Sequence, residues 1–303
     1  MTSIGPTLGK LVTLAKWLFT DKPTSAAIDI THRCNLKCKH CYWWQQEHPP
    51  EMSDPEMARF MRYLKVKGLR VAILYGGEPT LRLKLCQEAS QLFDSTLIFT
   101  NGLHGFAELK NAQWLVSLEG PGPISDAIRG EGVYEEVKKN ILKAPRPPLV
   151  HMTICKLNSS REVIEEFVDE MCSLPIKGIG FSFYTPVNSP NDEDLFVPLE
   201  ERDQIVDFLL VLREKYGKKL GFTPAMARQL KTNGLFSKWN HYSLCPVSKR
   251  VRCFYSDGSP KPCTYGEGAD CSRCGCAAVA AYMGAFHPLD FETLRVIKGL
   301  MIP

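Results

Sequence analysis

The sequence predicts an α/β fold: a partial (β/α)6 barrel followed by a small, cysteine-rich C-terminal extension. Short β-like runs alternate with helical patterns from about residue 26 to about residue 216, and strands that alternate with helices indicate a parallel sheet. Right-handed crossovers curl six such units into a partial barrel. The βα pattern stops near Gly221, and six of the twelve cysteines fall between Cys245 and Cys276. The extension therefore begins near Gly221.

Six apolar runs have the length and composition of buried strands. They cover residues 26–31, 71–75, 96–100, 114–118, 149–157 and 179–184. Each unusual cluster of residues in this region follows the C-terminal end of one of these runs. In α/β barrels that edge carries the chemistry, so we expect the motifs to line one rim. The polar loop 187–197, which follows the last run, is expected to form a lid.

Helical patterns separate the strands. Two of them open with capping boxes, Ser53-x-x-Glu56 and Ser159-x-x-Glu162, in which a hydroxyl and a carboxylate satisfy free backbone amides. The expected helices cover about 53–67, 81–92, 134–143, 159–171 and 199–216. In the extension, Asp257-Gly258 between short apolar runs predicts a hairpin.

We divide the chain into an N-terminal helix (1–25), the barrel (26–220) and the extension (221–303). The apolar stretch 9–20 is too short to span a bilayer and lacks the basic region and cleavage site of a signal peptide. We expect this helix to pack on the barrel. The alternative is an interfacial helix, with Lys10 and Lys16 near headgroups, which would give a peripheral membrane or lipid contact.

Composition favours a cytoplasmic protein. The formal net charge of +4 is too small to indicate a nucleic-acid partner. Disulfide frameworks occur in short secreted chains, whereas this chain has 303 residues and no signal peptide. The isolated Cys86, Cys155 and Cys172 are therefore expected to be small buried hydrophobes.

The most informative segment places Cys34, Cys38 and Cys41 in one loop with the spacing C-x3-C-x2-C. Four thiolates usually hold a [4Fe–4S] cluster, so three leave one iron without a protein ligand and open to a substrate. The alternative is a structural zinc site, with His32 or His40 as the fourth ligand. Zinc sites usually pair two short knuckles, and no second knuckle lies nearby in the sequence.

This motif resembles that of the radical S-adenosylmethionine (SAM) superfamily. The resemblance implies a radical SAM barrel, in which the amino and carboxylate groups of SAM chelate the open iron. An electron from the cluster then breaks a sulfur–carbon bond, which gives methionine and a 5′-deoxyadenosyl radical. The protein orients the cofactor and excludes water.

Further motifs extend the resemblance to the rest of the rim. The segment Gly76-Gly77-Glu78-Pro79 follows the second strand, and its glycines allow the backbone to approach a ligand closely and to point its amides at that ligand. In the superfamily this segment holds the amino group of SAM. An ordinary βα turn would explain the glycines but not the acid.

Four other positions are candidates for SAM contacts. Tyr42 follows the third cysteine, where similar enzymes place an aromatic near the adenine. Asn101 and the segment Ser117-Leu118-Glu119-Gly120 close the next two strands, and the latter resembles the SLDG motif of peptide-modifying members, with an acid one methylene longer. Arg129 resembles an arginine that pairs with the SAM carboxylate, as a planar guanidinium can; an exposed loop arginine is the alternative.

The tail resembles the SPASM/twitch extension of radical SAM enzymes through Cys245-x12-Gly258-x4-Cys263. That extension carries auxiliary iron–sulfur clusters. Six cysteines exceed the four for one cluster and fall short of eight for two, so we expect one auxiliary [4Fe–4S] cluster. The first choice of ligands is Cys245, Cys263, Cys271 and Cys274, with Cys253 and Cys276 as substitutes. A zinc knuckle at Cys271-x2-Cys274 is the alternative.

Three functions remain open. The first is a radical SAM enzyme that modifies an unactivated carbon of a peptide or small molecule, with flavodoxin or ferredoxin as electron donor. The second acts on an isoprenoid or lipid, because residues 262–268 loosely resemble the tail of hopanoid-modifying members and 277–286 is strongly apolar. The third is a non-enzymatic iron–sulfur or zinc protein, which would not need the rim motifs. Only 33 residues precede Cys34, too few for the N-terminal leader-binding domain that peptide-modifying members often carry, although a separate partner could supply one.

Overall fold

The computed structural model describes residues 23–234, 241–286 and 288–301. It contains one sheet of eight strands in the order β6-β5-β4-β3-β2-β1-β7-β8. All neighbours are parallel except the β7–β8 pair. The helix expected over residues 9–20 lies outside the described residues.

The six expected strands are confirmed. Their bounds are β1 (Ser25–Thr31), β2 (Val71–Gly76), β3 (Ser95–Thr100), β4 (Ala112–Ser117), β5 (Leu149–Ile154) and β6 (Gly178–Phe183). The fifth ends three residues earlier than expected, because the chain turns at Cys155, whose carbonyl accepts a hydrogen bond from Asn158 N at 3.1 Å. The expected hairpin is also present, as β7 (Val251–Phe254) and β8 (Pro260–Lys261), with Gly258 at φ 81° in its turn.

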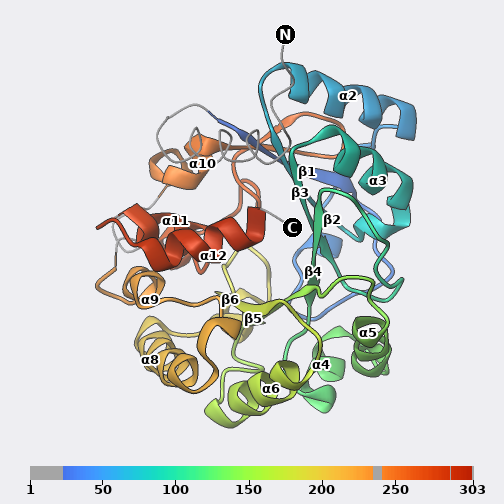
Figure 1. Cartoon of the computed structure of the whole chain (residues 1–303). Coiled ribbons are helices and arrows are strands. Elements are labelled where there is room, and N and C mark those ends of the chain that lie inside the picture. The colour runs from blue at the N-terminus through green and yellow to red at the C-terminus, as the bar shows by residue number, and fades with distance from the viewer. Residues whose placement is uncertain (1–22, 235–240, 287, 302–303) are drawn as a thin grey trace.

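The helices between the strands lie on the outside of the sheet (Figure 1). They are α2 (Asp54–Val66), α3 (Leu83–Leu92), α4 (Gly122–Arg129), α5 (Val133–Leu142), α6 (Arg161–Ser173), α7 (Asp192–Leu195) and α8 (Leu199–Tyr216), followed by α9 (Pro224–Leu230), α10 (Pro246–Arg250), α11 (Ala277–Phe286) and α12 (Phe291–Met301). The capping box at Ser53 is confirmed. The one at Ser159 is wrong by a residue, because Ser160 is the N-cap of α6 and its hydroxyl accepts from Val163 N at 3.3 Å.

Helix α4 was not expected. It begins with Gly-Pro-Ile-Ser, and both glycine and proline are poor residues for a helix interior. At the first turn, however, proline costs little because its missing N–H has no helical partner there. The helix forms within the short connection between β4 and α5, and it ends at Arg129, one of the candidate SAM-binding residues.

Alternation along the strands separates two environments. The outward side chains of the six barrel strands pack under the helices in two hydrophobic clusters, one under α2 and α3 and the other under α5, α6 and α8. The inward side chains face the hollow of the curved sheet. Since the sheet is not closed between β6 and β8, the barrel is partial, as the sequence predicts.

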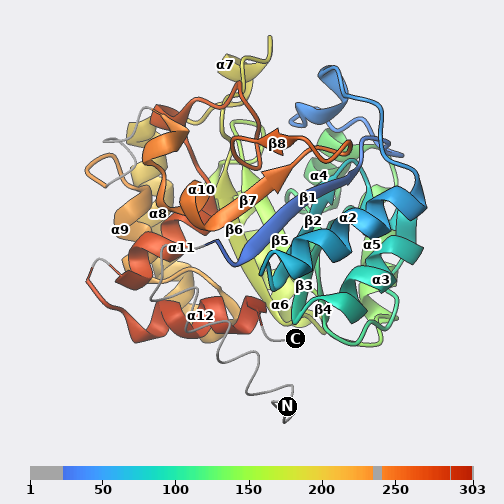
Figure 2. The same cartoon turned by 90° about the horizontal axis from the view of Figure 1, so that it is seen from above.

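The extension connects the two edges of the barrel. Strand β7 continues the sheet beside β1 (Figure 2). The chain beyond β8 then follows β6, where Phe183 N donates to Gly275 O at 3.0 Å and Gly275 N donates to Thr185 Oγ1 at 2.9 Å. A Cβ at Gly275 would lie 2.3 Å from Phe183 O, so only glycine allows this approach. The cysteine-rich segment therefore spans the lateral opening between β1 and β6.

The loop 187–197, expected to be a lid, is instead tied down. The carboxylate of Asp192 accepts hydrogen bonds from Tyr184 Oη at 2.6 Å, Val187 N at 3.0 Å and Ser189 N at 2.9 Å. Leu195 and Phe196 are buried in a small cluster with Tyr184. With a buried anchor at each end, this loop forms a support for the extension.

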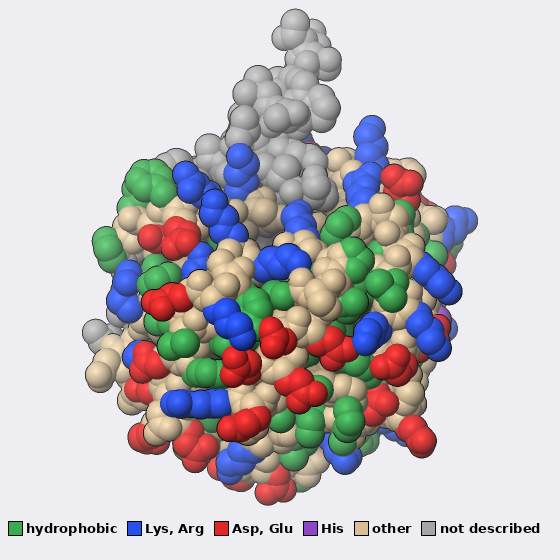
Figure 3. All heavy atoms as spheres, turned by 60° about the horizontal axis from the view of Figure 1, so that its bottom comes forward, with side chains coloured by type: hydrophobic (Ala, Val, Ile, Leu, Met, Phe, Trp, Pro, Cys, Tyr) green, Lys and Arg blue, Asp and Glu red, His purple; other side chains and the backbone are tan. Residues whose placement is uncertain are grey.

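The surface carries charges of both signs. On the face shown in Figure 3, acidic and basic side chains are interspersed among hydrophobic ones. Among the described helices, none combines the length and the apolar character needed to cross a membrane.

Candidate active site

The cysteine loop follows β1 and is held to the barrel by its backbone. Lys39 N donates to Ile128 O of α4 at 2.8 Å, and Cys41 N donates to Cys38 O at 3.0 Å. Cys34 is exposed, Cys38 is buried and Cys41 is partly buried, and none of the three forms a disulfide. Burial, with a further contribution from Cys38 and Cys34, raises the pKa of Cys41 to about 12. The thiols of Cys34 and Cys38 thus lie near enough to Cys41 to raise its pKa.

The histidines of the zinc alternative have other partners. His40 Nε2 lies 3.2 Å from Glu119 Oε1, and His32 Nδ1 lies 3.7 Å from Glu51 Oε2. Among the residues that the structure describes, no three His, Cys, Asp or Glu side chains are grouped so that they could hold a metal ion, and this is true of the cysteine loop and of the tail cysteines as well as of the histidines. The contacts of His32 and His40 therefore give no support to a Cys3His zinc site.

The glycines of the second motif bring two backbone segments together. Gly77 N donates to Thr31 O and Glu78 N donates to Arg33 O, both at 2.9 Å. A Cβ at Gly77 would lie 2.0 Å from Arg33 O, and Gly76 has φ 111°. These amides are therefore not free to point at a ligand, contrary to our interpretation of the sequence. The glycines instead press the turn after β2 against the start of the cysteine loop.

Glu78 is the buried centre of this turn, with 1% of its surface exposed. Its Oε1 accepts from Thr80 N at 2.9 Å, from Thr80 Oγ1 at 2.7 Å and from Thr100 Oγ1 at 2.8 Å. Its Oε2 accepts one bond, from Asn101 N at 2.7 Å. Because Oε2 accepts one bond where Oε1 accepts three, Oε2 is the oxygen that can accept another, for example from an ammonium group. Asn101 Nδ2 donates to Asn35 Oδ1 at 2.7 Å and so links the same turn to the cysteine loop.

Glu119 and Arg129 form a buried ion pair beside the thiols. Arg129 Nη2 donates to Glu119 Oε1, and Glu119 Oε2 accepts from Thr153 N at 2.8 Å. Burial alone would raise the pKa of Glu119, but His40 and Arg129 outweigh it and lower this pKa to about 2. Arg129 Nη1 also lies 4.0 Å from Cys38 Sγ. Glu119 and Arg129 are therefore neighbours, and both lie at the cysteine loop.

One donor in this group has no acceptor. Arg129 Nε is buried and lacks a hydrogen-bond partner among the described residues. A buried donor without a partner costs free energy, so unpaired donors in a native site indicate a missing acceptor. A carboxylate such as that of SAM would supply it. The residues present therefore fit the cofactor that the superfamily resemblance implies.

The remaining rim residues differ in how they are placed. Ser117 lies on the inner face of β4, partly exposed, and Pro79 begins the short 3-10 helix Pro79–Arg82 after the glycine turn. The side chain of Tyr42 turns to the extension, where its Oη donates to Thr264 O at 3.2 Å and its ring lies 6.0 Å from that of Tyr265. Any contact of Tyr42 with adenine is left to its backbone.

The tail cysteines gather in two ways. Cys253 is buried on β7 against Ala27 and Val251, as a packing residue would be. The other five are partly buried: Cys245, Cys263, Cys271, Cys274 and Cys276. Apart from burial, Cys276 and Cys245 raise the pKa of Cys274, and Cys263 and Cys245 raise that of Cys271. Cys245 therefore lies near Cys274 and Cys276 as well as near Cys263 and Cys271.

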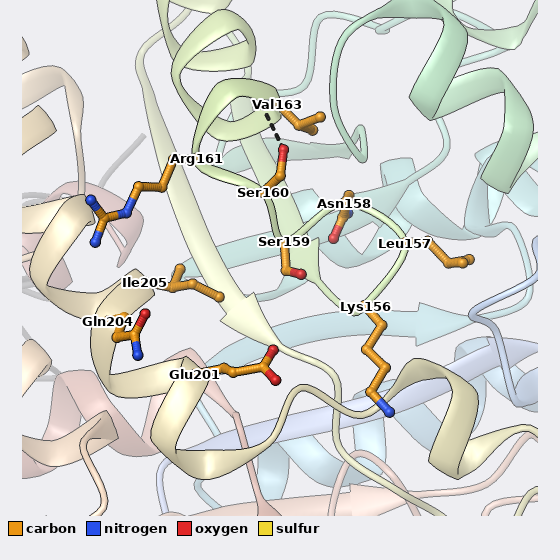
Figure 4. Close-up of a pocket in the computed structure, with 10 residues that line it drawn as sticks. All are labelled: Lys156, Leu157, Asn158, Ser159, Ser160, Arg161, Val163, Glu201, Gln204 and Ile205. Atoms are coloured by element: carbon orange, nitrogen blue, oxygen red, sulfur yellow. Dashed lines mark hydrogen bonds between the residues drawn. The ribbon is translucent and has the colours of Figure 1, made fainter.

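A pocket of about 420 Å³ lies away from the cysteine loop, between the loop after β5 and helix α8 (Figure 4). Its lining is Lys156, Leu157, Asn158, Ser159, Ser160, Arg161, Val163, Glu201, Gln204 and Ile205. It is connected to the site through Asn158, whose Nδ2 donates to Glu119 O at 2.9 Å. The loop after β5 thus helps to fix the backbone of Glu119 through Asn158.

Several residues of the site carry no signal of their own in the sequence. Thr80, Thr100 and Thr153 reach the site through the folded turns, and a threonine near a strand end is common. His40 was considered only as a zinc ligand. Lys261 of β8 forms a buried ion pair with Asp29 of β1 at 2.8 Å, between residues 232 positions apart. Only its place on the predicted hairpin could have suggested that this lysine lies near the barrel.

Comparison with known proteins supports the assignment of the motifs. The family model described as the radical SAM superfamily matches residues 28–170. The sporulation killing factor maturation protein SkfB of Bacillus subtilis is 30% identical over 161 residues, which cover 48% of this chain and 39% of SkfB. Pre-heme d1 synthase of Dinoroseobacter shibae is 30% identical over 149 residues, which cover 44% of this chain and 37% of that protein. The chain thus spans about two fifths of the length of these relatives.

Solved structures share the fold over a larger part of the chain. The crystal structure of Streptococcus suis SuiB bound to S-adenosylmethionine superposes with a TM-score of 0.64 at 19% identity, covering 84% of this chain and 64% of SuiB. SuiB bound to its precursor peptide SuiA gives the same TM-score at 16% identity, covering 90% and 67%. Residues 28–170, which include the cysteine loop, therefore form a radical SAM domain, and the chain shares the fold of SuiB.

Proposed function

We propose that this protein is an enzyme that reductively cleaves SAM at a [4Fe–4S] cluster held by Cys34, Cys38 and Cys41, and so modifies an unactivated carbon of its substrate. The observation that carries the proposal is the unpaired buried donor Arg129 Nε, on a guanidinium that lies beside Cys38. An electron carrier without a bound carboxylate would have no use for this donor.

Each residue has a role that its contacts allow. The free lone pair of Glu78 Oε2 accepts from the amino group of SAM. Arg129 binds the SAM carboxylate through Nε, while Glu119 holds the guanidinium in place through Nη2. When bound, the cluster and SAM supply the electron and the carbon radical. The chain orients SAM at the barrel rim and keeps it out of water.

We assign an auxiliary [4Fe–4S] cluster to the extension. Cys245, Cys263, Cys271 and Cys274 remain the first choice of ligands, and the proximity of Cys276 to Cys245 and Cys263 makes it the first substitute. This cluster would accept an electron from the product or stabilise the connection between β8 and β6. The three domain boundaries also remain proposals.

A peptide is the first choice of substrate, and a small molecule the second. SkfB is named for the maturation of a sporulation killing factor, and SuiB was solved with a precursor peptide, whereas the name of pre-heme d1 synthase describes a small-molecule product. The apolar helix α11 gives no support to a lipid substrate, because its residues 279–285 are buried.

The electron donor is expected to dock at the exposed side of the cysteine loop. Arg33, Lys37 and Lys39 lie within five residues of the exposed Cys34 in the sequence, and all three are exposed. An acidic flavodoxin or ferredoxin fits this face, which is consistent with a cytoplasmic enzyme. Glu51 neutralises part of the positive charge of this face, because its Oε1 lies 2.9 Å from Arg33 Nε.

The direct test is the formation of 5′-deoxyadenosine and methionine from SAM. Reconstituted protein with dithionite should form both products, and the variant Cys34→Ala, Cys38→Ala, Cys41→Ala should form neither. Products that persist in the triple variant, or their absence from reconstituted wild-type protein, would refute the proposed function.

A further inference from the structure

The inner face of the barrel keeps side chains that are open to solvent in the middle of the sheet. On β5, the outward Val150, Met152 and Ile154 are fully buried, whereas the inward His151 and Thr153 are partly exposed. The same alternation occurs on β3, where the inward Leu97 and Phe99 are partly exposed. Inward residues at the centre of a sheet stay exposed only if the space before them is not filled by the chain.

His151 is bordered by aromatic rings and by a glycine. Its ring lies 6.4 Å from that of Phe99, edge to face, and Phe99 stacks on Tyr75 of β2 with 4.2 Å between centroids. On the other side, Gly180 of β6 pairs with His151 in register, and a Cβ there would lie 3.5 Å from His151 Cδ2. The space before the imidazole is therefore flanked by an apolar wall on one side and by bare backbone on the other.

Ser182 determines which nitrogen of His151 carries hydrogen. Ser182 Oγ lies 2.9 Å from His151 Nε2 and accepts from Ala277 N at 3.3 Å. If Nε2 also donated to this oxygen, the hydroxyl hydrogen of the buried Ser182 would have no acceptor among the contacts of the described residues, which costs free energy. The hydroxyl therefore donates to Nε2. The neutral imidazole then carries its hydrogen on Nδ1.

The imidazole is neutral, and its second nitrogen is free. Desolvation lowers the pKa of His151 to about 4, so the ring is uncharged at neutral pH. Among the described residues, none accepts a hydrogen bond from Nδ1. His151 pairs in register with Ser117, the last residue of β4, and Glu119 follows two residues later. The Nδ1–H therefore lies one inward layer below the Glu119–Arg129 pair, on the hollow side of the sheet.

We propose that this layer is the substrate subsite and that His151 Nδ1–H donates a hydrogen bond to an uncharged substrate group, a carbonyl oxygen flanked by apolar or aromatic surface. The inference rests on the proposed function, because it concerns the same barrel. The rings of Phe99 and Tyr75 favour an apolar neighbour. The charged groups that act on His151 are Glu119 and Arg129, and these two pair with each other, so a carboxylate or phosphate here would compete with Glu119 for the same cation. A backbone carbonyl beside an apolar side chain of a peptide has this chemistry.

The first experiment determines the tautomer. The holoenzyme, labelled with ¹⁵N-histidine and kept oxidised with SAM bound, is examined by long-range ¹H–¹⁵N NMR, and His151→Asn identifies the signals of His151. We expect a neutral ring with hydrogen on Nδ1 at pH 7, and a changed tautomer or a tautomer mixture in Ser182→Ala. A protonated ring, or hydrogen on Nε2 in the wild-type protein, would overturn the inference.

The second experiment tests the ligand class with a defined probe, N-acetyl-L-phenylalaninamide, against its charged counterpart N-acetyl-L-phenylalanine. Calorimetry should show saturable binding of the amide only. Asparagine places an amide nitrogen near the position of Nδ1, whereas glutamine places it near Nε2. His151→Asn should therefore retain binding and His151→Gln should weaken it roughly five- to tenfold, the effect of one hydrogen bond. No binding of the amide, or equal loss in both variants, would contradict the proposal.

Failure of this inference is distinguishable from failure of the proposed function. The same wild-type preparation is assayed for 5′-deoxyadenosine without any probe. If it cleaves SAM and the probe experiments fail, only the subsite is wrong. If it holds no iron and cleaves no SAM, the proposed function is wrong, and the subsite inference is overturned with it.

Discussion

Arg129 Nη1 lies 4.0 Å from the sulfur of Cys38, while Nη2 of the same guanidinium donates to Glu119. One side chain at the end of α4 thus connects the cysteine loop to the end of β4. Arg129 is buried, and so is its partner Glu119. A buried ion pair is seldom a net source of stability, because desolvation offsets the attraction. Its use here is to hold a cation beside the thiols with one nitrogen left for a ligand.

Removing Arg129 should cost stability and SAM binding together. In Arg129→Met the buried carboxylate of Glu119 loses its guanidinium and keeps His40 as its remaining side-chain partner. The loss of unfolding free energy should therefore be at most about 3–5 kcal/mol, the cost of a broken buried ion pair. The measurement is urea denaturation of the iron-free protein. In the double variant Arg129→Met, Glu119→Gln most of the stability should return but SAM binding should not. Equal SAM affinity in this double variant and in wild type would contradict the role of Arg129.

Gly77 should not tolerate a methyl group. A Cβ there would lie 2.0 Å from Arg33 O, a backbone atom that cannot move without moving the cysteine loop. Gly77→Ala should therefore lower the iron bound at Cys34, Cys38 and Cys41, measured after reconstitution. Gly299→Ala is the matched control, because a Cβ at Gly299 has nothing within 4 Å, and it should reconstitute like wild type. Full iron content in Gly77→Ala would show that the close approach is not needed.

Glu78→Gln should weaken SAM binding. A hydrogen bond to a charged group contributes about 1.5–3 kcal/mol, so the loss of the anionic acceptor for an ammonium should raise the dissociation constant of SAM roughly ten- to hundredfold. Glu56→Gln is the control: its carboxylate caps α2 at Ser53, so it should change stability only. Equilibrium dialysis with labelled SAM gives both values, and equal affinities in the two variants would exclude Glu78 as the acceptor.

His151 should make stability depend on pH in a defined window. The pKa of His151 is about 4 in the folded protein, compared with an ordinary value of 6.5. The unfolded chain therefore protonates this imidazole more readily than the folded protein does. Its contribution to unfolding free energy is therefore complete above about pH 6.5 and is lost as the pH falls towards 4. Urea denaturation of iron-free wild type should lose more stability than His151→Asn between pH 7 and pH 5. Parallel losses would show that His151 titrates normally.

Iron content should separate the two groups of cysteines. Two four-iron clusters give about eight irons, and the triple alanine variant of Cys34, Cys38 and Cys41 should keep about four. Cys263→Ala should lose the tail cluster, whereas Cys253→Ala should keep it, because Cys253 packs against Ala27 in a small core. A tail cluster lost in Cys253→Ala and kept in Cys263→Ala would reverse the assignment.

Much of the fold could be predicted from the sequence, because the local apolar patterns match the strands and helices that form. The six strands and helix α8 lie where apolar periodicity places them, since each buries one face against its neighbours. The rim was also predictable: parallel strands bring Cys34, Glu78, Asn101 and Glu119 to one edge. Helix α4 was not, because Gly-Pro at its start is a weak helix signal and tertiary contacts decide it.

The partners of the site residues were beyond the sequence. The spacing of Glu119 and Arg129 does not show that they pair with each other and with His40, because this depends on how α4 returns to the cysteine loop. The contact of Tyr42 with Thr264 joins residues 222 positions apart. The occupied amides of Gly77 and Glu78 correct our interpretation of the glycine motif for the same reason: the Thr31 and Arg33 carbonyls reach them only in the folded barrel.

Electron paramagnetic resonance tests the central claim most directly, because it reports whether SAM binds the cluster itself. Anaerobically reconstituted protein, reduced with dithionite, should give an iron–sulfur signal that changes when SAM is added, and this change should be absent from the triple alanine variant. Zinc in place of iron at the cysteine loop, or a cluster signal that is indifferent to SAM, would contradict the account.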